Sequence, residues 1–142
     1  MMSQRRLLVV SNRLPFSAVK TQEGVELRPA AGGLISAMTP IMTAQGGLWV
    51  GWGGAISPEM ARDSRLGGME EAGFSLRFVE LSDKEVNRYY YGFSNRTIWP
   101  LFHDFVDKAQ FRDDQWKAYL SVNRKFALAV AAEVREGDLV WI

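Results

Sequence analysis

Two short segments, residues 7–10 (LLVV) and residues 138–142 (DLVWI), constrain the fold more than any other feature of the chain. Apolar runs of this length, without the polar residue at every second position that marks a half-exposed strand, are typical of strands buried on both faces. Such strands occur in parallel sheets whose connecting helices cover both sides. We therefore predict that the two segments are parallel strands of one sheet.

Two further strands are expected between them. One lies at residues 48–50, within the glycine-rich stretch GGLWVGWGG. The other lies at residues 74–81 (FSLRFVEL), where the alternation places Phe74, Leu76 and Phe78 on one face.

Helical patterns separate these strands. Ser82 followed by Glu85 forms a capping box, which predicts a helix of about three turns over residues 82–91. A longer helix is expected over residues 113–136, because apolar residues recur there every three or four positions, and Gly137 would close it. Strands alternating with helices predict an α/β fold with a parallel sheet.

Composition narrows the functional classes. The 142 residues suit one domain, and 17 basic residues against 16 acidic ones give a net charge of +1, which favours neither nucleic acid nor an anionic membrane as a partner. The chain has no cysteine, which excludes disulfides and thiolate catalysis. No apolar stretch approaches the roughly 18 residues of a membrane span, so a cytoplasmic protein is expected.

Arg13 follows the last apolar residue of the first strand by three positions, and Pro15 is expected to keep the chain from rejoining the sheet. Ligands of open parallel sheets bind beyond the carboxyl ends of the strands. A guanidinium there suits a phosphate, which it can bind with two parallel hydrogen bonds. The alternative is a surface arginine paired with a nearby carboxylate.

Gly32 and Gly33 form a second candidate anion site, because they precede an apolar run that is typical of a helix. The first N–H groups of a helix have no partner within it, and glycine lets a diphosphate approach the backbone closely. The motif is neither a dinucleotide-binding fingerprint nor a P-loop, so a plain turn is the alternative. Pro40 is expected to kink or end this helix early.

Aromatic residues crowd the region after residue 88. Tyr89, Tyr90 and Tyr91 cannot all be buried, since successive helical side chains point about 100° apart. Trp99 precedes Pro100, which predicts a fixed ring on a loop. Rings with a polar group are suited to stack on sugars and to hydrogen-bond with them, and core packing is the alternative.

His103 is the only histidine. A single imidazole without a cluster of acidic residues at ligand spacing makes no metal site. Because Phe102 and Phe105 lie beside it in the sequence, we expect a packed, hydrogen-bonded side chain.

Taken together, five motifs resemble the trehalose-6-phosphate synthases in order and spacing over essentially the whole chain. They are VVSNRLP near the start, AGGL at 31–34, GLWVGWGG at 47–54, YYYGFSNRTIWPLFH at 89–103 and YLSVNRKFA at 119–127.

The resemblance implies a retaining glycosyltransferase of the GT-B type, in which two Rossmann-like domains enclose the active site. It implies transfer of glucose from UDP-glucose to glucose 6-phosphate, giving trehalose 6-phosphate, without a metal ion or other cofactor. Residues 1–142 would be the N-terminal, acceptor-side domain of such an enzyme.

The resemblance also implies roles for particular residues. Arg13 would meet the acceptor phosphate, and Trp52, with Trp49 as the less favoured equivalent, would line the acceptor pocket. Tyr90 and Trp99 would also contact the acceptor. The donor would lie near two glycines, Gly32 and Gly33.

No catalytic residue is expected within residues 1–142. The family places its catalytic histidine and an acceptor-binding aspartate just after the position of Ile142, and the groups that neutralise the donor diphosphate lie in a C-terminal domain. The expected partners are therefore a sugar phosphate, a nucleotide sugar and the protein's own C-terminal domain, and the sequence is expected to be part of a longer chain.

Other interpretations stay open at this point. The chain could belong to a non-catalytic sugar-phosphate-binding or regulatory module of the same ancestry, or to a relative that uses another acceptor, such as a glucosylglycerol-phosphate synthase. The donor base (UDP, GDP or ADP), a homo-oligomeric state and a fused phosphatase domain are likewise open.

Overall fold

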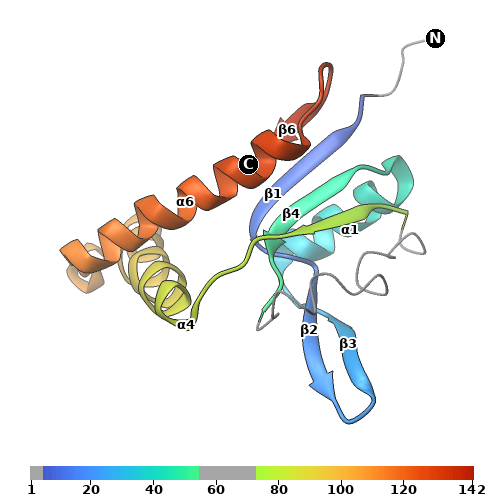
Figure 1. Ribbon diagram of the computed structural model, residues 1–142. Coiled ribbons are helices and arrows are strands. Elements are labelled where there is room, and N and C mark those ends of the chain that lie inside the picture. The colour runs from blue at the N-terminus through green and yellow to red at the C-terminus, as the bar shows by residue number, and fades with distance from the viewer. Residues whose placement is uncertain (1–4, 55–72) are drawn as a thin grey trace. The chain divides into compact units, whose positions relative to one another are not determined.

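The computed structural model describes residues 5–54 and 73–142, which fall into two compact units. The first unit comprises Met1–Glu80 with Ala129–Ile142, and the second comprises Leu81–Leu128. The strands of the described residues all belong to the first unit, whereas the second is helical (Figure 1).

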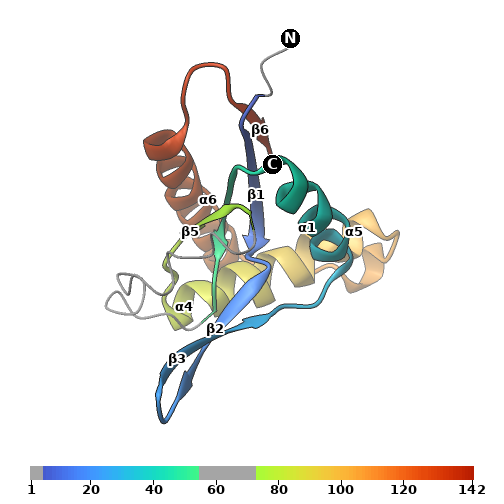
Figure 2. The same ribbon diagram turned by 90° about the vertical axis from the view of Figure 1, so that its right-hand side faces the viewer.

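The first unit contains a four-stranded sheet in the order β5-β4-β1-β6. Every neighbouring pair in it is parallel, and β1 lies between β4 and β6 (Figure 2). The predicted α/β fold and the parallel pairing of the first and last segments are therefore confirmed. The strands are β1 (Leu7–Arg13), β4 (Leu48–Trp52), β5 (Ser75–Phe78) and β6 (Leu139–Trp141).

Helix α1 (Gly33–Gln45) covers one face of this sheet. Its Met38 and Met42 are buried and join a cluster that also contains Leu7, Val9, Leu14, Trp49 and Phe74, with Phe16, Leu76 and Phe78 packed at its margin. On the opposite face, Leu8 and Val50 are fully buried as well. Burial of both faces explains why the apolar segments of β1 and β4 carry no alternation of polar residues.

Pro40 neither ends nor shortens α1, so the expectation of an early end is wrong. The helix continues for five residues beyond it. Buried methionines lie two residues before and two residues after Pro40. Tertiary packing of an apolar face stabilises a helix more than one backbone hydrogen bond does, and here it outweighs the bond that proline removes.

Two strands extend further than predicted. β1 continues to Arg13 rather than ending at residue 10, and β4 continues to Trp52 rather than to residue 50. The register between them shifts after Val10, and the Leu14 N–H then donates to the Trp52 carbonyl at 2.9 Å. The polar residues after the apolar run therefore remain part of the sheet.

The other two strands are shorter than predicted. β5 spans four residues of the predicted segment 74–81, although Phe74, Leu76 and Phe78 do share the core face. β6 is not buried on both faces, because Leu139 and Trp141 expose 51% and 49% of their surface. The reason is that β6 lies at the edge of the sheet, where it pairs only with β1 among the described strands.

A β-hairpin absent from the prediction follows β1. Strands β2 (Phe16–Thr21) and β3 (Gly24–Pro29) pair antiparallel from Phe16↔Pro29 to Thr21↔Gly24. Pro15 cannot donate a hydrogen bond, but its carbonyl accepts one from the Ala30 N–H at 2.8 Å. This bond closes the base of the hairpin.

The second unit begins with the predicted capping box, in which the Ser82 hydroxyl accepts from the Glu85 N–H and the Glu85 carboxylate accepts from the Ser82 N–H. The helix that it opens is longer than three turns. It runs without a break through α4 (Asp83–Glu85), a π-helix η2 (Val86–Ile98) and α5 (Trp99–Phe102).

The wide turns of η2 explain how this helix passes Pro100. The Trp99 N–H donates to the carbonyl of Ser94, five residues back. Pro100 has no N–H to donate to the backbone carbonyl of Arg96, four residues back. That carbonyl instead accepts a hydrogen bond from the Gln110 N–H at 2.7 Å. The Thr97 hydroxyl donates to the Gln110 carbonyl, which ties the segment after α5 back to the helix.

Helix α6 (Asp113–Glu133) ends four residues before Gly137, which lies in a turn with φ 85° rather than capping the helix. Its buried residues are Gln115, Val122 and Phe126. The apolar residues that recur along this helix are not all buried, because Trp116 and Leu120 expose 42% and 50% of their surface.

Tyr89 is a buried ring of the second unit, 4% exposed, and the centroid of its ring lies 5.7 Å from that of Tyr119 and 6.5 Å from that of Phe126. Burial, reinforced by the neighbouring tyrosines, raises the pKa of Tyr89 to about 12. Because the folded-state pKa lies above the ordinary value, the stability linked to it is complete below pH 10 and is lost as the pH rises towards 12.

An absorbance titration should therefore show one tyrosine ionising near pH 12. Tyr89→Phe should remove this step while preserving the ring packing, and Tyr91→Phe, at a 51% exposed position, should leave it in place. Persistence of the step in Tyr89→Phe would contradict the assignment.

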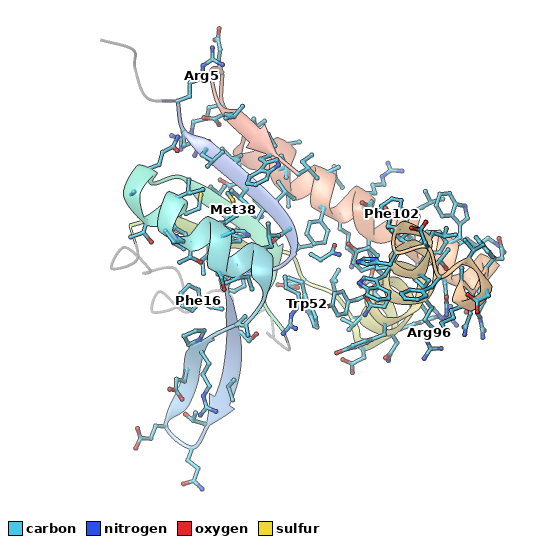
Figure 3. The ribbon with its side chains drawn as sticks, turned by 180° about the vertical axis from the view of Figure 1, so that it is seen from behind. Arg5, Phe16, Met38, Trp52, Arg96 and Phe102 are labelled. Atoms are coloured by element: carbon cyan, nitrogen blue, oxygen red, sulfur yellow. The ribbon has the colours of Figure 1, made fainter. Side chains whose placement is uncertain are left out.

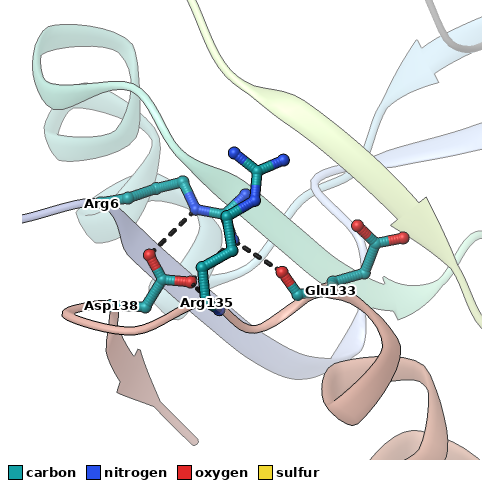
Figure 4. Close-up of polar contacts among 4 residues, drawn as sticks. All are labelled: Arg6, Glu133, Arg135 and Asp138. Atoms are coloured by element: carbon teal, nitrogen blue, oxygen red, sulfur yellow. Dashed lines mark hydrogen bonds and ion pairs between the residues drawn. The ribbon is translucent and has the colours of Figure 1, made fainter.

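Arg6 and Asp138 join the start of β1 to the turn before β6 (Figure 4). The guanidinium donates to both carboxylate oxygens, at 3.1 and 2.6 Å, and its Nη2 also donates to the Glu133 carbonyl at 2.7 Å. The Arg135 N–H donates to the same carboxylate at 2.7 Å. The pair thus satisfies a carbonyl in the last turn of α6.

Hydrogen bonding from Arg6 holds the pKa of the Asp138 carboxyl below its usual range. The stability gained is present above the ordinary aspartate pKa, about 3.9, and is lost as the pH falls through the lowered value. Asp138→Asn should lower the urea midpoint at pH 7 by a clear margin and have little effect at pH 2. Glu26→Gln, which breaks an exposed pair with Arg28, is the matched control and should have little effect at either pH.

Candidate functional site

The carboxyl edge of the sheet in the first unit presents Arg13 and Trp52, the last residues of β1 and β4. Figure 3 shows Trp52 at the end of the sheet opposite to Arg5, which precedes β1. The two residues are register partners, and the guanidinium carbon of Arg13 lies 5.9 Å from the centroid of the Trp52 ring. This distance allows a cation–π contact that holds the arginine over the indole.

The Arg13 side chain is exposed, and no carboxylate among residues 5–54 and 73–142 forms an ion pair with it. The alternative of an arginine paired with a neighbouring acid therefore finds no support in the described part of the chain. Its N–H donors remain available to an anion at the strand end.

Ser11 positions the backbone of Arg13, a role that sequence reasoning missed. The Trp49 Nε1–H donates to the Ser11 hydroxyl at 2.8 Å, and that hydroxyl donates to the Arg13 carbonyl at 2.6 Å. Trp49 itself is 0% exposed, whereas Trp52 is partly exposed, so Trp52 is the more accessible of the two tryptophans. The sequence signal that could have indicated this role is the position of Ser11, a polar residue directly after the apolar run at residues 7–10.

Gly32 and Gly33 lie at the N-terminus of α1, as predicted. Because α1 connects back towards the start of the parallel strand β4, its N-terminus lies towards the edge where the strands end (Figure 2). Gly32 has φ 156° and ψ 150°, a conformation almost confined to glycine. A Cβ on Gly33 would meet no atom within 4 Å, so the backbone there is open to approach.

Tyr90 and Trp99 lie in the second unit, on η2 and α5. Tyr90 is half-buried and meets the ring of Tyr91 edge-on at 5.1 Å, and Tyr91 is 51% exposed, which confirms that the tyrosine triplet is not wholly buried. Trp99 is 50% exposed. It is helical rather than on a loop, because the π-helical turn accommodates Pro100.

The surroundings of His103 match the expectation only in part. Its Nδ1 hydrogen-bonds to the Trp99 carbonyl at 2.7 Å, as expected, but the residue is exposed. Its ring stacks on the indole of Trp99, with centroids 4.0 Å apart and planes 17° apart.

Among the described residues, no helix is long and apolar enough to cross a bilayer. The same residues contain no group of three histidine, aspartate or glutamate side chains that could hold a metal ion.

Residues 5–142 match the family described as Glycosyltransferase family 20. A relative, the bifunctional trehalose-6-phosphate synthase/phosphatase of Thermoproteus tenax, is 45% identical over an alignment of 148 positions, which covers 96% of this chain and 19% of the relative.

Two solved structures share the fold. One, described as trehalose-6-phosphate from E. coli bound with UDP-2-fluoro glucose, has a TM-score of 0.71 and 34% identity over 96% of this chain. The other, a UDP-forming α,α-trehalose-phosphate synthase from Burkholderia xenovorans in complex with glucose 6-phosphate, has a TM-score of 0.70 and 28% identity over 96% of this chain. In each of them the match covers 27% of that structure's chain, so this chain spans less than a third of their length.

Proposed function

The chain belongs to glycosyltransferase family 20, and from this premise we propose that residues 1–142 form the N-terminal, acceptor-side domain of a trehalose-6-phosphate synthase. In the proposed reaction the bond between the anomeric carbon of UDP-glucose and its diphosphate oxygen breaks, the anomeric hydroxyl oxygen of glucose 6-phosphate bonds to that carbon with retention, and UDP leaves with the hydroxyl proton. The names of the relative from T. tenax and of the structure from B. xenovorans support this choice.

One observation carries the proposal: an exposed arginine without a carboxylate partner among the described residues, at the carboxyl end of a central parallel strand. A dianionic sugar phosphate matches the charge of Arg13 and the geometry of its donors. Ligands of parallel sheets bind at this edge, and the hydrogen bonds through Ser11 hold the backbone of the arginine in place.

The other predicted contacts extend the proposal. Trp52, whose ring lies against the Arg13 guanidinium, would line the acceptor pocket. In the second unit, Tyr90 and Trp99 would contact the acceptor through partly exposed rings, which suit the faces of a sugar. The N-terminus of α1 at Gly32 and Gly33 would lie near the donor, where the helix dipole favours a diphosphate.

We propose that the remaining machinery lies outside residues 1–142. The catalytic histidine would follow Ile142 directly, and a C-terminal domain would bind the nucleotide sugar. The transfer would proceed in the cytoplasm without a metal ion. Since such a transfer depends on positioning and charge stabilisation, residues 1–142 alone would bind glucose 6-phosphate weakly and transfer no glucose.

The test uses the full-length protein that contains this chain. UDP release is measured with UDP-glucose in the presence of glucose 6-phosphate, of glycerol 3-phosphate, or of no acceptor. Release that depends on glucose 6-phosphate is the expected result. Release only with glycerol 3-phosphate would assign another acceptor, and calorimetric binding of glucose 6-phosphate without any turnover would favour a non-catalytic module. Replacing UDP-glucose with GDP- or ADP-glucose identifies the donor base.

A further inference from the structure

We propose that His103 is a positioning residue that holds the indole of Trp99 in a binding orientation, and this rests on the proposed acceptor role of Trp99. An indole that is 50% exposed has little core packing to hold its orientation. The ring of His103 lies nearly parallel to it, with centroids 4.0 Å apart and planes at 17°. That stack covers part of one ring face and restricts rotation of the indole.

The imidazole is itself held in place. Its Nδ1 lies 2.7 Å from the carbonyl oxygen of Trp99, one helical turn back. A carbonyl only accepts hydrogen bonds, so Nδ1 must carry the proton and donate it. The carbonyl of Trp99 thus orients the imidazole of His103, and the imidazole in turn orients the indole of Trp99.

A turn directly after α5 places a second ring, that of Phe105, beside the indole of Trp99. Asp104 adopts φ 61°, and the Phe105 N–H then donates to the Pro100 carbonyl at 2.9 Å. This is the arrangement of a Schellman motif, which reverses the chain at a helix end. It returns Phe105 to Trp99, with ring centroids 6.2 Å apart and planes at 11°.

An indole held in place by these contacts should bind the acceptor more tightly than a mobile one. A mobile side chain must be ordered when a ligand binds, and this lowers affinity. With the indole already ordered, the acceptor does not bear that cost. Removing His103 should therefore weaken acceptor binding by about three- to tenfold, the scale of one aromatic pair. It should not change the affinity for the nucleotide sugar.

The experiment measures both KM values in the full-length protein for three substitutions. His103→Ala removes the stack and the hydrogen bond, His103→Phe keeps a ring, and His103→Asn keeps a donor for the Trp99 carbonyl. We expect KM for glucose 6-phosphate to rise most in His103→Ala and less in the other two, with KM for UDP-glucose unchanged. Phe102→Ala is the matched control, since Phe102 is the preceding residue and is 84% exposed; it should change neither KM.

A double mutant separates positioning from a general structural role. If His103 acts through the indole, His103→Ala should have no further effect on KM once Trp99 is alanine. An unchanged KM in the single mutant, or an equal rise in both backgrounds, would overturn the inference while leaving the proposed function intact. If Trp99→Ala itself leaves KM unchanged, the acceptor role of Trp99 and the inference both fall.

The ring orientation can be followed without turnover. The indole N–H resonance of Trp99, assigned by its loss in Trp99→Ala, should shift and broaden in His103→Ala and stay nearly unchanged in Phe102→Ala. An unaltered resonance in His103→Ala would contradict the positioning role whatever the activity of the variant.

Discussion

Replacing Arg13 with alanine in the full-length enzyme should raise KM for glucose 6-phosphate by about ten- to a hundredfold and leave KM for UDP-glucose nearly unchanged. A hydrogen bond to a charged group contributes about 1.5–3 kcal/mol, which corresponds to that range of affinity. The effect is expected to fall on one substrate, because the guanidinium is proposed to bind the acceptor phosphate. Steady-state kinetics with each substrate varied in turn measures both values.

Two variants make this test specific. Arg28→Ala removes another exposed arginine of the first unit, one that pairs with Glu26 at 3.1 Å, and should change neither KM. Arg13→Lys keeps the charge but loses the planar pair of donors, so it should recover only part of the affinity. Equal effects of Arg13→Ala on both substrates, or none, would mean that the arginine is structural.

Gly51→Ala should strongly destabilise the fold. A Cβ on this residue would lie 2.9 Å from the Ser11 carbonyl oxygen, 3.0 Å from the Leu14 nitrogen and 3.1 Å from the carbonyl carbon of Arg13. All three are backbone atoms at the register shift between β1 and β4, so the strands would have to separate. We expect a loss of about 2–3 kcal/mol in the free energy of unfolding, the usual scale of overpacking.

Gly33→Ala is the matched control for folding, because a Cβ there meets no atom within 4 Å. Urea unfolding should show a lower midpoint for Gly51→Ala and little change for Gly33→Ala. In the full-length enzyme, Gly51→Ala should also raise KM for glucose 6-phosphate, since the displaced backbone carries Arg13. A midpoint equal to that of the unmodified chain would show that the two strands can move apart at little cost.

Local patterns predicted the parts of the fold that depend on neighbouring residues. The apolar run at residues 7–10 is compatible only with burial on two faces, and the structure confirms the parallel pairing that this requires. Ser82 and Glu85 form their capping box from atoms three residues apart, so the sequence alone was sufficient.

The errors arise where distant segments supply the hydrogen bonds. Pro100 predicted a loop for Trp99, yet the helix continues because Gln110 satisfies the carbonyl of Arg96. Pro15 does keep the chain out of the four-stranded sheet, as expected, but the hairpin that its carbonyl closes through Ala30 was not predicted. Proline restricts its own backbone and that of the preceding residue. It does not determine which other group donates a hydrogen bond to a carbonyl near it.

The sequence by itself determined the α/β class and placed Arg13 at a strand end and Gly32 and Gly33 at a helix start, because burial periodicity and strand direction are local properties of the chain. Only the tertiary structure showed that Arg13 lies against Trp52 without a carboxylate partner among the described residues, and that His103 stacks on Trp99. Those facts depend on register, on a π-helical turn and on a left-handed residue at Asp104. Each of these is decided by packing and hydrogen bonds between segments rather than by the residues of one segment.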